Sequence, residues 1–153
     1  MKRIGFLLIV LLLLSACESI NRKSSVPNVP VNYTVYINRE HPYFVVENIL
    51  ATIIVTERKF QHQYIGYAGL LIWVGMDNAY HAADLCCPHC VLRNKPLQVD
   101  EPYAVCPICG EQYDISYGFC IPTKGITKEP LKLYNILPKY NAIGRAEELY
   151  IAN

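Results

Sequence analysis

The sequence lacks the features that nucleic-acid-binding proteins and most enzymes need. Its 14 Lys and Arg against 13 Asp and Glu leave a formal net charge of +1, and no basic run is present. Proteins that bind nucleic acids gather positive charge on one face or stripe, so nucleic acid is not expected as a partner. Repeats of solenoid length are missing, and so is any nucleophile paired with a base beyond the cysteines. We therefore expect a protein that is not itself an enzyme and has no small-molecule substrate.

Long apolar runs are also missing, except near the N-terminus. Lys and Arg at residues 2–3 precede the apolar run 4–14, which is too short to span a bilayer and is typical of a signal peptide. The letters LSAC at residues 14–17 resemble the cleavage box of bacterial lipoproteins. The resemblance implies that residues 1–16 are removed and that the thiol of Cys17 is acylated. It also implies a protein anchored to a membrane of the cell envelope, with the periplasm as the expected side.

The segment after the lipidation site is polar and contains two prolines. Residues 17–30 show no apolar periodicity, so they are predicted to form a flexible tether. The remaining residues, 31–153, have the length of one domain.

Seven short segments of this domain are rich in β-branched, aromatic or apolar residues, and glycine and proline lie between them. Short strands at such close spacing favour an all-β sandwich or barrel. Helix signals are weak and fall at 42–50 and 145–150. The strand-like segments are 31–37, 49–55, 70–74, 80–83, 103–105, 112–115 and 131–136.

Cysteine is abundant for so short a chain. The sequence has seven cysteines, and the six that follow Cys17 all lie within 35 consecutive residues. A scaffold of disulfides in an exported protein would spread its cysteines over the whole domain. Their clustering therefore predicts a metal site. The six are Cys86, Cys87, Cys90, Cys106, Cys109 and Cys120.

Four of these cysteines form two CxxC knuckles, CPHC at 87–90 and CPICG at 106–110, with 15 residues between them. This spacing is typical of four-cysteine zinc sites, because two cysteines three positions apart on a tight turn direct both sulfurs to one point. Gly110 suits the backbone angle that such a turn requires. Two facing knuckles, as in rubredoxin-like or zinc-ribbon-like subdomains, can complete a tetrahedron around zinc or a single iron.

The same region resembles the Rieske ferredoxin family. The resemblance rests on CPH at 87–89, CPICGEQYD at 106–114 and PLKLY at 130–134, with Asp84 before the first loop, and it covers about residues 70–136. It implies a two-sheet all-β scaffold whose small metal-binding subdomain spans about 84–120. It also implies a [2Fe–2S] cluster near the surface that carries single electrons to a redox partner protein.

By position, Cys87 and Cys106 match the family's cysteine ligands, and His89 matches its first histidine ligand. Tyr113 matches the tyrosine that donates a hydrogen bond to the sulfur of a ligating cysteine. Cys109, however, stands where the family has its second histidine.

Three models of the site remain open. In the first, Cys87, His89, Cys106 and Cys109 hold a [2Fe–2S] cluster. In the second, Cys90 replaces His89 and the four cysteines hold a [2Fe–2S] cluster, iron or zinc. In the third, no metal is bound and the cysteines form disulfides.

The remaining pair, Cys86 and Cys120, could form a disulfide if the other four cysteines bind metal. We expect a membrane-anchored electron carrier, and the alternative is a non-redox lipoprotein with structural zinc or disulfides. Histidine ligands raise the potential of a Rieske cluster to roughly −150 to +300 mV, whereas a thiolate adds negative charge and disfavours reduction. A cluster here is therefore expected to lie below most two-histidine Rieske proteins in potential.

Overall fold

The computed structural model describes residues 24–153. The predicted signal peptide, the lipidation site Cys17 and the first part of the predicted tether lie outside the described residues. No helix in the described part has the length and apolar character needed to cross a membrane.

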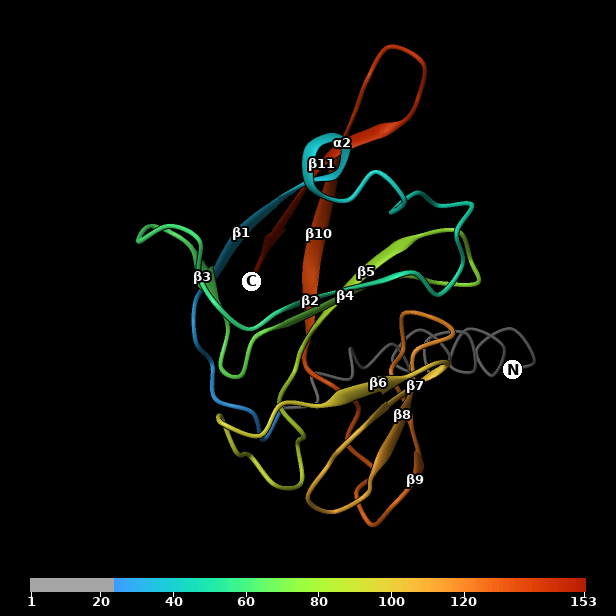
Figure 1. The fold of residues 1–153 in the computed structure, drawn as a ribbon. Coiled ribbons are helices and arrows are strands. Elements are labelled where there is room, and N and C mark those ends of the chain that lie inside the picture. Colours follow the sequence, from blue (N-terminus) through green and yellow to red (C-terminus); the bar gives the residue numbers. More distant parts are fainter. Residues whose placement is uncertain (1–23) are drawn as a thin grey trace, which may run out of the picture.

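Within residues 24–153 the fold is all-β, with two antiparallel sheets and one four-residue helix, α2 (Ile37–Glu40), as Figure 1 shows. The large sheet has seven strands in the order β2-β4-β5-β10-β11-β1-β3. Their bounds are β1 Val31–Tyr36, β2 Thr52–Val55, β3 Tyr64–Ile65, β4 Leu70–Val74, β5 Tyr80–Asp84, β10 Leu133–Tyr140 and β11 Ala146–Ala152.

The small sheet has four strands in the order β6-β7-β8-β9 and is inserted between β5 and β10. Each of its strands has only three residues. Figure 1 shows it beyond one end of the large sheet. The bounds are β6 Gln98–Asp100, β7 Tyr103–Val105, β8 Gln112–Asp114 and β9 Pro122–Lys124.

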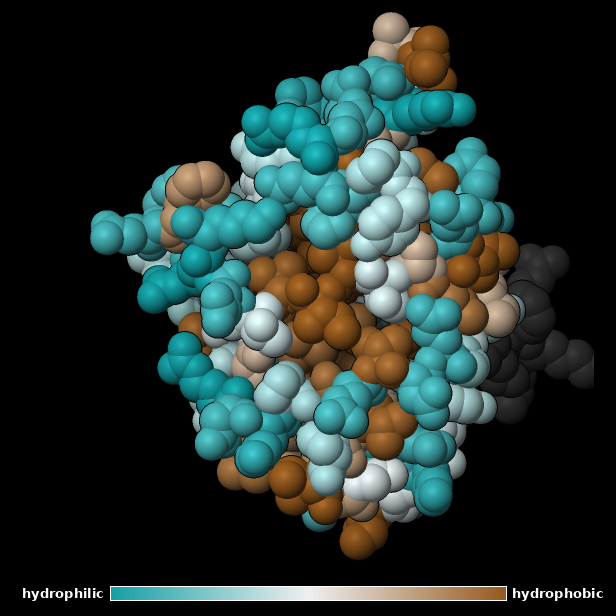
Figure 2. All heavy atoms as spheres, viewed as in Figure 1, coloured by the Kyte–Doolittle hydropathy of each residue, from teal (hydrophilic) through white to brown (hydrophobic). Residues whose placement is uncertain are grey.

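The large sheet curls into a nearly closed barrel whose two edge strands are β2 and β3. Residues 56–63 connect these edges. In Figure 2, which has the same view as Figure 1, apolar side chains gather in a hollow in the middle of the molecular face that points toward the reader, over β2 and β4.

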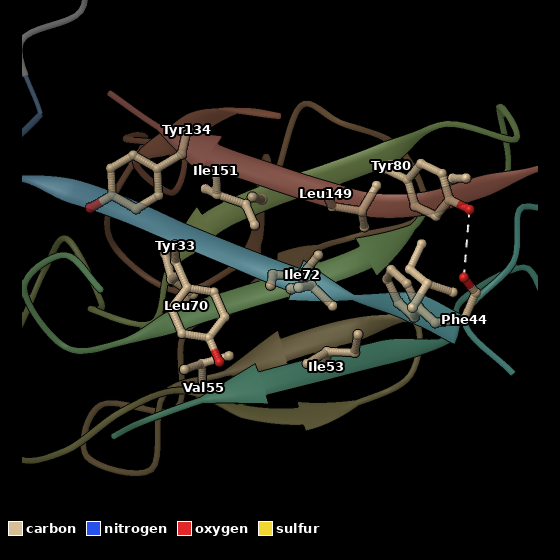
Figure 3. Packing of buried hydrophobic residues seen from close by; sticks show 14 of the residues in the cluster. Tyr33, Phe44, Ile53, Val55, Leu70, Ile72, Tyr80, Tyr134, Leu149 and Ile151 are labelled. Carbon is tan, nitrogen blue, oxygen red and sulfur yellow. Dashed lines mark hydrogen bonds between the residues drawn. The ribbon is translucent and has the colours of Figure 1, made fainter. Parts of the chain in front are cut away.

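The β4 strand explains how one chain builds two cores. All five of its residues are buried. Leu70 and Ile72 pack inside the large sheet, while Leu71 and Trp73 pack toward the small sheet. Because both faces of β4 are covered, its sequence is a continuous apolar run rather than an alternating one. Figure 3 shows the packing inside the large sheet, where Leu149 and Ile151 of β11 lie near Ile72.

The all-β class predicted from the sequence is confirmed, and each predicted strand overlaps an observed one. The predicted terminal helix at 145–150 is wrong: this segment belongs to β11, which pairs with both β1 and β10. The weak helix signal at 42–50 corresponds to turns. Val26, in the predicted flexible tether, is buried in the core between the sheets, so that end of the tether is packed.

Candidate metal centre

Two tight turns present the four knuckle cysteines. The first follows β5, and the second joins β7 to β8. In each turn, the residue after the second cysteine donates its backbone N–H to the carbonyl of the first: Val91 to Cys87 at 2.9 Å and Gly110 to Cys106 at 3.0 Å. The two knuckles therefore have the same hydrogen-bonding pattern although their sequences differ.

The residue after each second cysteine adopts a left-handed backbone conformation. Gly110 has φ +73°, so the requirement for glycine expected at this position is confirmed. Val91 has φ +51° at the matching position. A β-branched residue in this region is strained, so the first knuckle holds its shape against a local cost.

The knuckles face one another and bring four sulfurs together. The Sγ atoms of Cys87, Cys90, Cys106 and Cys109 all lie within 4.8 Å of one another. Cys87 Sγ lies 3.8 Å from Cys109 Sγ, and Cys106 Sγ lies 3.8 Å from Cys90 Sγ. A metal–sulfur bond of about 2.3 Å places the sulfurs of a tetrahedron about 3.8 Å apart. The spacing therefore fits one tetrahedral ion.

His89 lies outside this set of mutually close sulfurs. It is exposed, and its Nδ1 lies 4.0 Å from Cys90 Sγ. Together with Cys109 and Glu111 it forms a second group whose ligand atoms lie within 4.8 Å of one another. Of the two candidates that the sequence left open for the fourth position, the structure brings Cys90 into the cage and leaves His89 at its rim.

The cage runs from the interior to the surface. Cys87 and Cys106 are buried, Cys90 is partly buried, and Cys109 is exposed. Burial alone would raise the pKa of the Cys106 thiol, but backbone N–H groups of Cys109 and Ile108 directed at its sulfur lower that pKa below its usual value. Hydrogen bonds to the charged form favour it. The second knuckle thus favours the thiolate form of Cys106, which is the form that binds a metal.

Tyr113 stands between the cage and a buried carboxylate. Its hydroxyl lies 3.5 Å from Cys87 Sγ, the contact expected from the family resemblance, but it donates to Glu111 Oε2 at the shorter distance of 2.8 Å. Because the hydroxyl has one proton, the carboxylate competes with the sulfur for it.

The carboxylate of Glu111 is itself held in place by backbone N–H groups from the segment after β9. Its Oε1 accepts backbone N–H groups from Ile126 at 2.8 Å and Thr127 at 2.7 Å. Burial would raise the pKa of Glu111, but the Thr127 N–H, the Tyr113 hydroxyl and the Ile126 N–H together lower it below its usual value. Sequence reasoning identified Glu111 only as part of a motif, and nothing local indicated that it would be buried.

Asp84 is the second important carboxylate that sequence reasoning gave no role. It is fully buried at the end of β5. Its two oxygens accept the backbone N–H groups of Tyr67, Ala68 and Cys86 and the hydroxyl of Tyr134, at 2.6–3.0 Å. Asp84 therefore ties the start of the first knuckle to the large sheet.

Cys86 and Cys120 are buried, free thiols. Burial, with the neighbouring Asp84 carboxylate, raises the pKa of Cys86 to about 12. Burial also raises the pKa of Cys120. Both thiols are therefore protonated and unreactive at neutral pH. A disulfide between them stays a prediction.

Comparisons with known proteins give one structural match. No family model matches the chain, and no curated protein matches its sequence. Among solved structures, the Sphingomonas yanoikuyae B1 ferredoxin superposes with a TM-score of 0.41 and 18% sequence identity, over 71% of this chain and 93% of that chain.

Proposed function

We propose that the protein carries single electrons on one iron ion held by Cys87, Cys90, Cys106 and Cys109. The observation that carries this proposal is the spacing of the four sulfurs, all within 4.8 Å of one another. A [2Fe–2S] cluster would place two irons and two sulfides between the pairs of thiolates, so the pairs would have to move apart. One tetrahedral ion needs no such movement, and a tetrahedral set of four thiolates suits iron or zinc.

The position of the cage supports electron transfer over a purely structural role. Cys109 is exposed, and the neighbouring Ile108 is 52% exposed. A redox partner could therefore approach close to one of the ligands. When bound, the iron would supply the change between ferric and ferrous states. The protein's own part is to hold four thiolates in a fixed tetrahedron, which suits both oxidation states and limits reorganisation.

Backbone and side-chain groups around the cage would set the stability of the extra electron. The N–H groups of Ile108 and Cys109 favour negative charge on Cys106. On the other side, Glu111 draws the proton of Tyr113 away from the sulfur of Cys87. A buried carboxylate close to the cage disfavours the addition of an electron there.

A structural zinc ion is the second candidate, because the short strands of the small sheet fit a metal whose main role is to stabilise the subdomain. Strands of three residues each form few ladder hydrogen bonds, and such subdomains commonly depend on a metal to fold. Iron would staple the sheet in the same way, so only metal identity separates the two candidates.

Metal and sulfide analysis of anaerobically purified protein tests the proposal. About one iron per chain without sulfide, with a reversible one-electron wave in voltammetry, is the expected result. Two irons with two sulfides would favour the [2Fe–2S] cluster predicted from the sequence. Colourless protein with zinc would favour the structural candidate.

Two neighbouring variants test the ligand set. Cys90→Ala should lose the metal, whereas His89→Ala should retain it, because only Cys90 belongs to the set of four close sulfurs. Cys86→Ala is the control for loss of a buried cysteine that lies outside this set. Retention of metal in Cys90→Ala together with its loss in His89→Ala would contradict the assignment.

The membrane anchor is part of the same proposal. Acylation of Cys17 would hold the carrier at the periplasmic face of a membrane, near membrane-bound redox partners. Labelling with a radioactive fatty acid should mark the protein, and Cys17→Ala should abolish the label. A label that persists in Cys17→Ala would place the acyl chain elsewhere.

A further inference from the structure

A small pocket lies where the large sheet meets the first knuckle. It has a volume of about 210 Å³ and is open to solvent. Arg58 reaches it from the connection between β2 and β3, and Arg93 reaches it from the loop after Cys90. Two arginines from distant parts of the sequence therefore line one pocket. Its other lining residues are Val29, Pro30, Thr56, Tyr64, Ile65 and Gly66.

The two arginines are not neutralised by the protein around them. Neither forms an ion pair within residues 24–153, where the three ion pairs involve other side chains. No Asp or Glu of this part of the chain is among the lining residues. The lining residues therefore carry two positive charges and no negative charge.

One carboxylate, that of Asp84, lies close behind the lining residue Gly66. A Cβ atom built on Gly66 would lie 2.6 Å from Asp84 Oδ2, so this carboxylate lies directly behind the pocket floor. Its oxygens already accept four hydrogen bonds from protein groups. The lining itself thus carries two arginines and no carboxylate, and the carboxylates near it include Asp84 behind Gly66 and Glu57 between Thr56 and Arg58 in the sequence.

We propose that this pocket binds a phosphate group between Arg58 and Arg93. Guanidinium groups match phosphate oxygens in pairs of parallel hydrogen bonds, which makes arginine suited to this anion. The hydroxyls of Thr56 and Tyr64 line the same space and can donate further hydrogen bonds. An isolated phosphate or the phosphodiester of an anionic lipid headgroup would present this chemistry.

The location of the pocket gives the proposal its functional meaning. Val29 and Pro30, the end of the predicted tether, form part of its wall. A lipid headgroup at this place would hold the domain against the membrane at the point where the anchor begins. Arg93 lies three residues after Cys90, so a bound phosphate would also tie the knuckle loop to the β2–β3 connection.

Titration with inorganic phosphate at low ionic strength tests the site directly. The metal-loaded full chain should bind one phosphate per chain in isothermal titration calorimetry. Arg58→Ala and Arg93→Ala should each weaken binding by about tenfold or more, the effect of losing hydrogen bonds to a charged group. Arg145→Ala removes one positive charge from the exposed β10–β11 turn and should leave binding unchanged.

Vesicle sedimentation identifies the source of the phosphate. The quantity compared is the extra binding to vesicles of phosphatidylcholine with phosphatidylglycerol over phosphatidylcholine alone, so the contribution of the N-terminal anchor cancels. A decrease in Arg58→Ala and Arg93→Ala, but not in Arg145→Ala, would identify a lipid headgroup. An effect of these variants on inorganic phosphate alone would identify a free phosphate.

Two results would overturn the proposal. The first is the absence of saturable binding both to inorganic phosphate and to the anionic lipid. The second is an equal loss of binding in Arg145→Ala. This result would show that binding depends only on the net charge of the protein and not on the pocket. Circular dichroism and metal content of each variant confirm that fold and cage are intact.

Discussion

The two sheets of this protein are held together by different means. The core inside the large sheet consists of aliphatic and aromatic side chains from strands of up to eight residues. The small sheet has three-residue strands, and its core includes one cysteine of each knuckle, Cys87 and Cys106, together with Cys86 and Cys120. Apolar burial suffices where strands are long, whereas a short-stranded subdomain needs an additional staple.

The two sheets also meet at a packed joint that involves none of the knuckle cysteines. The imidazole of His81, on β5, packs on Trp73 with ring centroids 5.3 Å apart. A Cβ atom on Gly118, beyond β8, would lie 2.5 Å from this ring, so only glycine permits the approach. Met76 donates its backbone N–H to the Ser116 carbonyl at 2.7 Å across the same joint.

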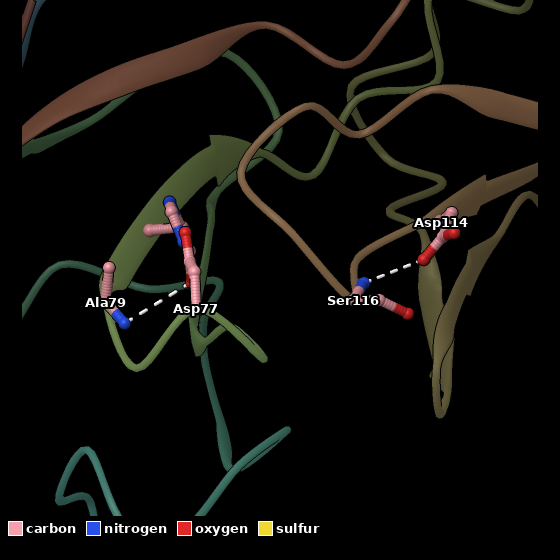
Figure 4. A network of polar contacts seen from close by, with 5 residues as sticks. Asp77, Ala79, Asp114 and Ser116 are labelled. Carbon is pink, nitrogen blue, oxygen red and sulfur yellow. Dashed lines mark hydrogen bonds and ion pairs between the residues drawn. The ribbon is translucent and has the colours of Figure 1, made fainter.

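Two aspartates shape the turns that meet there. Asp77 accepts the backbone N–H of Ala79 at 3.3 Å, and Asp114 accepts that of Ser116 at 2.7 Å, as Figure 4 shows. Each aspartate closes a turn by accepting a hydrogen bond from the backbone N–H of the residue two positions further along the chain. The joint is thus built from local turns of both sheets.

Removing the metal should produce the largest difference in stability between the small sheet and the large sheet. Structural metals contribute an apparent binding free energy on the order of 10 kcal/mol, which the small sheet cannot replace by burial. In Cys106→Ser, or after chelation, amide hydrogen exchange should show loss of protection in β7 and β8 and its retention in β10 and β11. Cys86→Ser serves as the control for a buried cysteine outside the cage. Simultaneous loss of protection in both sheets would mean that they form one cooperative unit.

The reverse experiment weakens the large sheet alone. Leu149 is fully buried inside it, so Leu149→Ala should lower the free energy of unfolding by about 2–5 kcal/mol. Leu137→Ala is the matched control, because Leu137 is 62% exposed on the neighbouring strand, and it should cost below about 0.5 kcal/mol. Urea unfolding measures both. Metal loss from folded Leu149→Ala would contradict the independence of the cage.

Asp84 connects the regions, so its replacement should affect both. Asp84→Asn exchanges a carboxylate that accepts four hydrogen bonds for an amide with one acceptor oxygen. We expect a loss of about 1–3 kcal/mol in urea unfolding and faster release of metal to a chelator. Tyr134→Phe removes one of the four donors and should have a smaller effect in both measurements. An Asp84→Asn protein equal to the wild type in both would remove Asp84 from this connecting role.

The smallest effect is expected at the joint. Burial would raise the pKa of Asp77, but the hydrogen bond and charge of His81 and the Ala79 N–H lower it below its usual value of 3.8. Because the pKa is depressed in the folded state, this stabilisation is present above about pH 4 and is lost as the pH falls through the folded pKa. The pair is partly exposed, so the contribution should stay below about 1 kcal/mol.

An NMR titration of the carboxyl carbons checks this prediction. Asp77 should titrate below 3.8, and His81→Ala should raise its pKa toward that value. A pKa of Asp77 that does not respond to His81→Ala would show that the pair adds nothing.

Much of the fold could be predicted because strand signals are local. The β4 run LLIWV and the alternating start of the domain at 31–36 both indicate strands without knowledge of the rest of the chain. The segment 145–150 was wrongly predicted as a helix because Glu147 and Glu148 resemble a solvated helix face. In the structure they lie on β11 between two partner strands, whose pairing overrides local propensity.

The spacing of the knuckles was enough to predict a metal cage and the glycine conformation at Gly110. It could not choose between His89 and Cys90, because adjacent residues on a tight turn point in different directions. That choice depends on the first knuckle's backbone, including the left-handed Val91, and on where the second knuckle lies across from it.

Residue order alone thus established the class of fold, the two knuckles and the candidate ligands, since these follow from patterns within a few residues of one another. The burial of Asp84 and Glu111, the cage of four sulfurs and the presence of Arg58 and Arg93 in the lining of one pocket depend on segments far apart in the chain. Such contacts arise only when two sheets pack, because burial and charge proximity are properties of the assembled fold.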